Sequence, residues 1–407
     1  MSNKTSIVIV GGGAVAIHVA QALDKQLSPS KYSLTMLTET DYYRHLPAAL
    51  RAFVTAEGDL ESQMTFPYDK IFGKDTKNGI GRVGTVQLGK VVSVEEKAND
   101  KGYVVLEGGQ RIEWNVLLIA TGSEWEGPLR WPNRLSDLES QMTFPYDKIF
   151  GKDTKNGIGR VGTVQLGKVV SVEEKANDKG YVVLEGGQRV EWNVLLIATG
   201  SEVARGLEDR GVVILNGDSV TGLEQDVLDG IQGVVPGRTI TTTKGVTLPA
   251  ELIIPTRGSR RVNTTFLGDN SPSAVTINAA LVEQGRLDVS RTLQLTSNPN
   301  VFAGGDVVAL NEAHTIVKAW AHTSVIVENI LALLTARENG TEVVHLKKYK
   351  KAMDGIAITN GARRGTMYLD FFTIPILGWP IILGDWITST LKSQSLSAGG
   401  IRSWMGQ

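Results

Sequence analysis

The sequence predicts an α/β protein built around a parallel sheet, and three observations predict it. The chain begins with a short buried strand at Ile7–Val10, a glycine turn at Gly11–Gly13 and a helix from about Ala14 to Lys25. A second apolar run ends in small residues at Ile119-Ala120-Thr121-Gly122. A third strand, Asn300–Ala303, is followed by two glycines, a carboxylate and a long apolar helix. Strands that alternate with helices in this way are typical of parallel sheets.

Composition excludes several classes of chemistry. The 407 residues are 42% hydrophobic and 21% charged, and the net charge of −1 gives no overall attraction to nucleic acid or acidic membranes. The sequence contains no cysteine, which excludes disulfides, thiolate metal sites, cysteine nucleophiles and redox-active dithiols. Its five histidines show no metal-ligand spacing, so no metal site is predicted. The chemistry must therefore come from a bound cofactor, carboxylates or hydroxyls.

An internal repeat occupies the middle of the chain. Residues 59–124 recur at 137–202, and the two copies differ only at Ile112 and Val190. Such near-identity indicates a tandem duplication or a misassembled gene product rather than a repeat fold. Each copy shows alternating runs that predict an antiparallel meander leading into one buried strand. Only one of these buried strands can lie beside Ile7–Val10, and we predict that the first copy supplies it.

The remaining elements follow in order. Further strands are predicted at Ser33–Thr38 and Glu251–Thr256, and a long helix at Ile316–Thr335. From about His345 the chain forms a separate C-terminal segment of mixed β character. The best linker candidates, by composition, are residues 125–136 and Gly268–Pro272.

The first candidate motif is Gly11-Gly12-Gly13-Ala14-Val15-Ala16, a G-x-G-x-x-A between a strand and a helix. Its glycines permit a tight turn and close backbone approach to a pyrophosphate, and the helix N-terminus offers N–H groups to the phosphates. An acidic residue is expected near the end of the second strand, but Thr38 stands there and Glu39 follows one position later. A purely structural turn is the alternative, and the strand–helix context favours a dinucleotide.

Two further motifs support a bound cofactor. The strand that ends at Thr121-Gly122 lets the chain pass close under a dinucleotide, although a strand ending at a turn gives the same pattern. Asp306, after Gly304-Gly305, is placed to accept hydrogen bonds from a cofactor hydroxyl, the alternative being a capping role. His322, near the start of the long helix, is predicted to be a packing histidine.

Together, in this order and spacing, the three motifs resemble the two-dinucleotide-binding-domain flavoprotein fold. More narrowly, the chain resembles the apoptosis-inducing-factor-like family, in the branch of the ferroptosis-suppressing NAD(P)H:quinone reductase and its fungal relatives. The resemblance covers about 1–136 and 206–407. Its specific matches are the Thr121-Gly122 and Gly304–Asp306 runs together with Pro47–Ala52, Ile254–Arg260, Ala357–Gly361 and Gly384–Trp386.

The resemblance implies FAD as the cofactor and NAD(P)H as electron donor. It implies a Rossmann-like FAD-binding domain at 1–136 plus 297–345, a duplicated segment with the remnant of an NAD(P)H-binding domain at 137–296, and a C-terminal segment at 346–407. Val92 is taken from the first repeat copy, and Val170 is its twin. The candidate cofactor-binding residues are Gly11, Gly12, Gly13, Ala14, Val15, Glu39, Arg51, Val92, Thr121, Gly122 and Asp306. No catalytic side chain is assigned, because the flavin carries the chemistry.

The chain departs from the family pattern after Ala120-Thr121-Gly122-Ser123, near the end of the first repeat copy. The second Gly-rich strand–turn–helix, which would hold the nicotinamide nucleotide, is not predicted anywhere between 125 and 250. Two functions therefore stay open. One is an FAD-dependent oxidoreductase that passes electrons from NAD(P)H to a quinone-like acceptor. The other is an FAD-binding but catalytically impaired protein, or a misassembled product, without a working NAD(P)H site.

The expected partners and cellular location follow from the resemblance and from one apolar run near the C-terminus. The expected partner is a small-molecule acceptor, with no nucleic acid. The apolar run Phe371–Ile387 is short and holds two prolines, so we predict no transmembrane helix there. The expected location is cytoplasmic, with peripheral membrane contact through this run as an open alternative.

Overall fold

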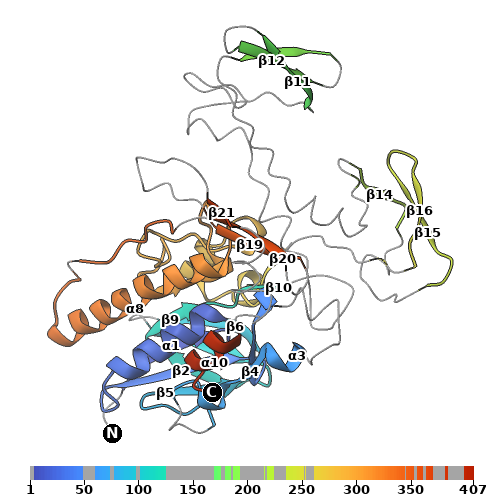
Figure 1. Ribbon diagram of the computed structural model, residues 1–407. Helices are drawn as coiled ribbons and strands as arrows, with labels where there is room; N and C mark the ends of the chain where they lie inside the picture. The colour runs from blue at the N-terminus through green and yellow to red at the C-terminus, as the bar shows by residue number, and fades with distance from the viewer. Residues whose placement is uncertain are drawn as a thin grey trace. The chain divides into compact units, whose positions relative to one another are not determined.

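The computed structural model divides the chain into two compact units, Met1–Gln141 with Ile214–Gln407, and Met142–Val213 (Figure 1). The structure describes residues 4–48, 60–73, 78–97, 101–124, 169–175, 179–184, 187–192, 215, 218–223, 235–251, 253, 261–343, 345–352, 355–360, 364–369, 381–383 and 398–407.

A five-stranded sheet organises the first unit. Its order is β18-β9-β1-β2-β5, and every neighbouring pair is parallel. The strands are β1 (Thr5–Val10), β2 (Tyr32–Thr38), β5 (Gly84–Leu88), β9 (Val116–Ile119) and β18 (Val301–Ala303). All four residues of β9 are buried, as a strand covered on both faces requires. The predicted parallel sheet is confirmed, and so is the pairing of the first repeat copy with β1.

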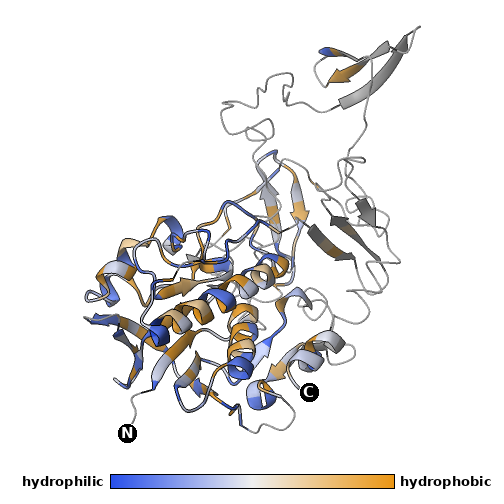
Figure 2. Cartoon of the chain, turned by 90° about the vertical axis from the view of Figure 1, so that its left-hand side faces the viewer, coloured by the Kyte–Doolittle hydropathy of each residue, from blue (hydrophilic) through white to orange (hydrophobic). Residues whose placement is uncertain are grey.

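The helices α1 and α8 pack against each other, and α1 also packs on the five-stranded sheet (Figure 1). α1 (Ala14–Gln26) buries Val15, Val19 and Leu23, which lie one helical turn apart. α8 (Ile316–Asn339) ends at Gly340, whose φ of 62° closes the helix in the left-handed region. Its length and hydropathy would suffice to cross a membrane, but more than half of its apolar window is buried inside the fold, as in a core helix. Figure 2 shows hydrophobic residues concentrated on the strands and packed helices, with hydrophilic residues on outer loops.

The predicted meander of the first copy forms an antiparallel sheet of β6 (Val91–Lys97), β7 (Lys101–Leu106) and β8 (Arg111–Trp114). The prediction that Gly268–Pro272 is a linker is wrong. Its first residues form the short helix η4 (Gly268–Asn270). The hydroxyl of fully buried Ser271 accepts a 2.7 Å hydrogen bond from the amide of Val94. Turn-forming residues here serve packing rather than separation.

The second copy repeats the same local structure in the second unit. β11 (Val169–Lys175), β12 (Lys179–Leu184) and β13 (Arg189–Trp192) form an antiparallel sheet with the register of β6–β8. The same residues therefore form the same meander in both places. The counterpart of β9, at 193–200, lies outside the described residues.

We expect the second copy to be the less stable of the two. Val104 on β7 is fully buried in the main core, whereas its twin Val182 on β12 is only partly buried. Amide hydrogen exchange should therefore be slower at Val104 than at Val182 by at least about tenfold, or ~1.4 kcal/mol in opening free energy. The flanking sequences are nearly identical, so the intrinsic exchange rates match. Equal protection of both amides would contradict this ranking.

The remaining strands pair locally. From Gly355 the chain forms an antiparallel sheet, which confirms the predicted β character of the C-terminal segment. The predicted strand at 251–256 lies mostly outside the described residues, and of the apolar run 371–387 only β21 is described. The other elements are β3 (Tyr42–Arg44), β4 (Thr65–Pro67), β10 (Ser123–Glu124), β14 (Val220–Thr221), β15 (Thr239–Thr242), β16 (Thr247–Pro249), β17 (Arg261–Val262), β19 (Gly355–Asn360), β20 (Arg364–Leu369), β21 (Ile381–Leu383), η1 (Leu46–Ala48), α3 (Leu60–Gln63), η2 (Tyr68–Lys70), α7 (Val275–Ala279), η5 (Glu283–Gly285), η6 (Gly305–Val307) and α10 (Ala398–Trp404).

Candidate cofactor-binding edge

The carboxyl ends of the parallel strands bring the predicted motifs to one edge of the sheet. Gly11 directly follows β1, Thr121 comes two positions after the end of β9, and Gly304 directly follows β18. In sequence, the chain moves from β1 towards β2 and later returns to the other side of β1 with β9. Ligands of open α/β sheets bind where the strand order reverses in this way. The edge between β1 and β9 is therefore the candidate site.

Gly11 allows β1 and β9 to leave the sheet in close contact. Its φ is +122°, a conformation that residues with a side chain rarely adopt. A Cβ at this position would overlap the carbonyl oxygen of Ala120 and lie 2.7 Å from its carbonyl carbon. Backbone hydrogen bonds from Gly11 to Leu37 at 2.8 Å and from Ala120 to Val10 at 2.9 Å hold the turn in place. The predicted tight turn is thus present in the fold.

Gly12 lies under two side chains that sequence reasoning did not assign. The hydroxyl of Tyr68, on η2, donates a 2.5 Å hydrogen bond to the carbonyl of Gly12. A Cβ on Gly12 would lie 2.5 Å from Oγ1 of Thr38 and would also overlap the Tyr68 hydroxyl. Burial raises the pKa of Tyr68, so it remains a neutral donor. Tyr68 lies 56 residues from Gly12 in sequence, and no local pattern predicts this contact.

Gly13 and the first turn of α1 offer an open anion site. A Cβ on Gly13 would have no atom within 4 Å, in contrast to Gly11 and Gly12. Gly13 is the N-cap of α1, with no side-chain cap and no acidic residue in the first turn. The amides of Ala14 and Val15 therefore lie at the positive end of the helix dipole, and no carboxylate in the first turn competes for them. This arrangement suits the phosphates of a dinucleotide.

Thr121 supplies an orphan polar group at the same edge. Its side-chain oxygen is buried and has no hydrogen-bond partner among the described residues. Burying a hydroxyl without a hydrogen-bond partner lowers protein stability by about 1–3 kcal/mol. A ligand that forms a hydrogen bond with this oxygen would remove that cost. The next residue, Gly122, has φ of +70° and open space where a Cβ would stand. Both observations fit a bound cofactor that passes over the end of β9.

We expect Thr121→Val to separate cofactor affinity from stability. Valine keeps the shape but removes the unpaired hydroxyl, so the free energy of unfolding of the apoprotein should rise by roughly 1–2 kcal/mol. FAD affinity should fall about fivefold to tenfold, because the ligand loses a hydrogen bond worth ~1 kcal/mol. Thermal unfolding of the apoprotein and FAD titration measure the two quantities. The control is Thr264→Val, since buried Thr264 donates to the carbonyl of Gly285 at 2.6 Å and its loss should lower stability.

Asp306 lies in η6 at the end of β18, with its carboxylate partly exposed at the edge. Its Oδ2 accepts a 2.7 Å hydrogen bond from the hydroxyl of Ser123, the first residue of β10. Its main-chain carbonyl accepts from Arg286 Nη1 at 2.7 Å, and Arg286 also contacts Nε2 of His314 at 2.5 Å. Burial, reinforced by the Arg286 charge, lowers the pKa of His314 to about 4, so this imidazole is neutral at pH 7. Sequence reasoning missed Ser123 and Arg286, which are local neither to each other nor to Asp306.

The other predicted cofactor-binding residues do not all lie at this edge of the sheet. Glu39 follows β2 at the same edge and is exposed. Val92 lies on β6, in the antiparallel sheet rather than the parallel one, and is partly buried. Its twin Val170 lies on β11 of the second unit. Arg51 is outside the described residues, so its predicted role stays a prediction.

The G-x-G-x-x-G spacing alone does not identify a phosphate-binding loop. It recurs at Gly79–Gly84, and hence at 157–162 in the duplicate, where none was expected. In the first copy this turn precedes a strand, β5, instead of opening a helix. Its amides at Val83 and Gly84 donate to the buried carboxylate of Asp24 at 2.7 and 2.8 Å. These donors are therefore occupied, and the turn is structural.

A known protein family covers most of the chain. Residues 5–324 match the pyridine nucleotide-disulphide oxidoreductase family. The FAD-dependent oxidoreductase FVFD30 of Flammulina velutipes is 29% identical over 84% of this chain and 95% of its own length. Apoptosis-inducing factor homolog B of Dictyostelium discoideum is 26% identical over 97% of this chain and 95% of its own length. Ferroptosis suppressor protein 1 of Taeniopygia guttata is 25% identical over 89% of this chain and 90% of its own length.

The fold is shared with a solved structure as well. The sulfide:quinone oxidoreductase of Aquifex aeolicus superposes with a TM-score of 0.55 at 12% identity, covering 99% of this chain and 91% of that one. The relatives favour an FAD-dependent NAD(P)H oxidoreductase over the impaired or misassembled alternative. The chain is similar to apoptosis-inducing-factor-like and FAD-dependent oxidoreductases. It belongs to the pyridine nucleotide-disulphide oxidoreductase family, which implies FAD as the cofactor and NAD(P)H as the electron donor.

Proposed function

We propose that this chain binds FAD across the carboxyl edge of β1 and β9 and passes electrons from NAD(P)H to a quinone-like acceptor. The observation that carries the proposal is the convergence of three unrelated features on one edge. These are the open N-terminus of α1 at Gly13, the unpaired Thr121 hydroxyl and the Asp306 carboxylate. When bound, FAD accepts a hydride and releases electrons singly or in pairs.

Each of these groups has a separate task in the proposal. The amides after Gly13 bind the pyrophosphate, and Asp306 accepts hydrogen bonds from the hydroxyls of the cofactor. Ser123 orients Asp306 through its 2.7 Å hydrogen bond. The pairing of β18 with β9 is the reason we keep 1–136 and 297–345 together as the proposed FAD-binding domain.

The acceptor is proposed from chemistry and from the family branch. Because the sequence has no cysteine, electrons cannot leave through a protein dithiol and must pass directly from the flavin to an acceptor. A quinone-like molecule is such an acceptor, and the resemblance to the ferroptosis-suppressor branch favours it. The cytoplasmic location and the peripheral membrane contact through 371–387 belong to the same proposal.

The test follows flavin absorbance in the purified protein under anaerobic conditions. Addition of NADH or NADPH should bleach the oxidised flavin band, and a short-chain ubiquinone analogue should then restore it. A disulfide, such as lipoamide, should not restore it and is the matched control. Reoxidation by the quinone no faster than by the disulfide would overturn the proposed acceptor, and no bleaching by either nucleotide would overturn the proposed donor.

A further inference from the structure

A buried network of four polar side chains contacts the loop Gly304–Asp306, which we call the Asp306 loop. Its members are His322, Lys318, Glu312 and Tyr349. His322 and Lys318 lie on α8 and are 1% and 2% exposed, and the side chain of Glu312 is 3% exposed. Tyr349 is 6% exposed and comes from the segment that precedes β19. Charged residues are almost never buried this fully without a role in structure or function. The proposed electron transfer assigns no task to any of them.

His322 connects this network to the cofactor edge. The amide of Gly305, the residue before Asp306, donates to Nδ1 of His322 at 3.1 Å. Nε2 of the same ring contacts Oε1 of Glu312 at 3.0 Å. Nδ1 can accept only if it carries no proton, so Nε2 bears the proton and donates to Glu312. The two bonds therefore select one tautomer of a neutral imidazole.

Glu312 is held as an anion that fixes this tautomer. Burial alone would raise the pKa of Glu312, but hydrogen bonds from His322 and Tyr349 outweigh it and lower the pKa below its usual value. The hydroxyl of Tyr349 donates to Oε2 at 2.7 Å, and Nζ of Lys318 lies 3.9 Å from the same oxygen. With both oxygens engaged, the carboxylate has little freedom to release His322.

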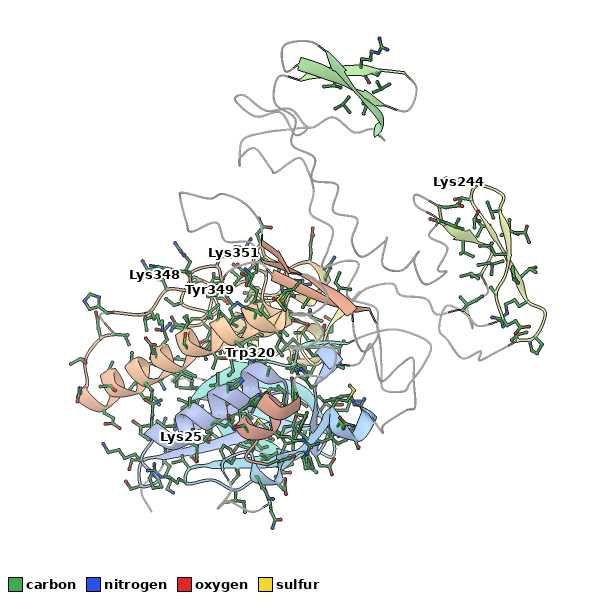
Figure 3. All side chains as sticks on the ribbon, viewed as in Figure 1. Lys25, Lys244, Trp320, Lys348, Tyr349 and Lys351 are labelled. Carbon is green, nitrogen blue, oxygen red and sulfur yellow. The ribbon has the colours of Figure 1, made fainter. Side chains whose placement is uncertain are left out.

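The network also holds the C-terminal segment against α8. The Tyr349 ring meets the His322 ring edge-on, with centroids 4.6 Å apart and an interplanar angle of 81°. Nζ of Lys318 donates to the carbonyl of Ala352. Figure 3 shows Tyr349 on this segment, with Lys348 and Lys351 labelled near it. Lys348 and Lys350 are exposed, whereas Tyr349 between them is buried.

The loop that His322 holds has little room to move. Gly305 has φ of +79°, and a Cβ on Gly304 would lie 2.7 Å from Ile326 and 3.0 Å from Val15. Val15 belongs to the first turn of α1, so the Asp306 loop and the dinucleotide turn are packed together. A change of even a few tenths of an ångström in Gly305 would move Asp306 relative to α1. A hydrogen-bond acceptor for the Gly305 amide would therefore fix where Asp306 lies relative to α1.

We infer that His322 is a positioning residue of the FAD site, which holds the Gly305–Asp306 loop through Nδ1 while Glu312 keeps its tautomer. The inference rests on the proposed placement of FAD at the β1–β9 edge. It goes beyond the packing role predicted for His322 from the sequence. A packing role requires only the volume of the ring, whereas positioning requires an acceptor at Nδ1.

Two amide variants separate these roles. Asparagine places its oxygen near Nδ1 and can accept from Gly305, whereas glutamine reaches towards Nε2 and retains only the bond to Glu312. We expect His322→Asn to bind FAD within about threefold of the wild type, and His322→Gln and His322→Leu to bind it about tenfold more weakly. The flavin absorption bands and midpoint potential should shift in the glutamine variant and be restored in the asparagine variant.

The controls keep failure of the inference distinct from failure of the proposed site. His345→Asn, at an exposed histidine outside the network, should change neither affinity nor spectrum. Thermal unfolding of each apoprotein reports stability separately. Equal FAD affinity and spectra in the asparagine and glutamine variants, or unfolding of both, would overturn the positioning role. If the wild type binds FAD but Thr121 and Asp306 variants bind it unchanged, the proposed edge fails instead.

Discussion

Gly13→Ala is expected to weaken FAD binding by about 100-fold or more while leaving the apoprotein folded. The added methyl group meets no protein atom within 4 Å, so the turn itself tolerates it. It would stand where the pyrophosphate approaches the N-terminus of α1, and it would displace hydrogen bonds worth roughly 1.5–3 kcal/mol each. Alanine is a poorer N-cap than glycine, so apoprotein stability should fall by less than about 1 kcal/mol.

The matched variant is Gly11→Ala, at the first glycine of the same turn. Here the methyl group would overlap the carbonyl of Ala120, and φ of +122° disfavours any side chain. Backbone strain and overpacking together should lower the free energy of unfolding by roughly 2–5 kcal/mol. Thermal unfolding of both apoproteins, followed by FAD titration, distinguishes the two glycines. Gly13→Ala with wild-type FAD affinity would show that the pyrophosphate does not lie at this turn.

Much of the fold was predictable because its signals are local. β1, α1 and β9 are recognised from short apolar runs that end at glycines, and α8 from helical spacing over 24 residues. The prediction of a linker was wrong because tertiary packing, and not local composition, determines the structure there. Gly268–Pro272 has the composition of a linker, yet the hydroxyl of Ser271 is buried and binds the backbone of β6.

The candidate edge was predictable only in its backbone parts. Glycines at Gly11 and Gly122 are visible in the sequence because few other residues adopt their conformations. The side chains that hold these turns are not. Tyr68, Ser123 and His322 reach the edge from three different elements, and each forms its bond across 17 to 183 residues of sequence. Their residue types carry no chemical signature until the topology places them together.

Asp306→Ala is expected to weaken FAD binding by about 10-fold to 100-fold without unfolding the chain. Its carboxylate is partly exposed at the edge, and each hydrogen bond that it would accept from a cofactor hydroxyl contributes roughly 1.5–3 kcal/mol. The hydrogen bond from Arg286 is made to the main-chain carbonyl, so the substitution leaves it in place. FAD titration and the flavin content of the purified variant measure the effect.

Two companion variants assign the effect to the carboxylate. Asp306→Asn keeps the shape and one acceptor oxygen but loses the charge, so its affinity should lie between those of the wild type and the alanine variant. Ser123→Ala removes only the 2.7 Å hydrogen bond that orients the carboxylate, and should cost about 0.5–1.5 kcal/mol, or twofold to tenfold in affinity. Wild-type flavin content and affinity in Asp306→Ala would remove Asp306 from the site and leave Ser123 with a structural role at the end of β9.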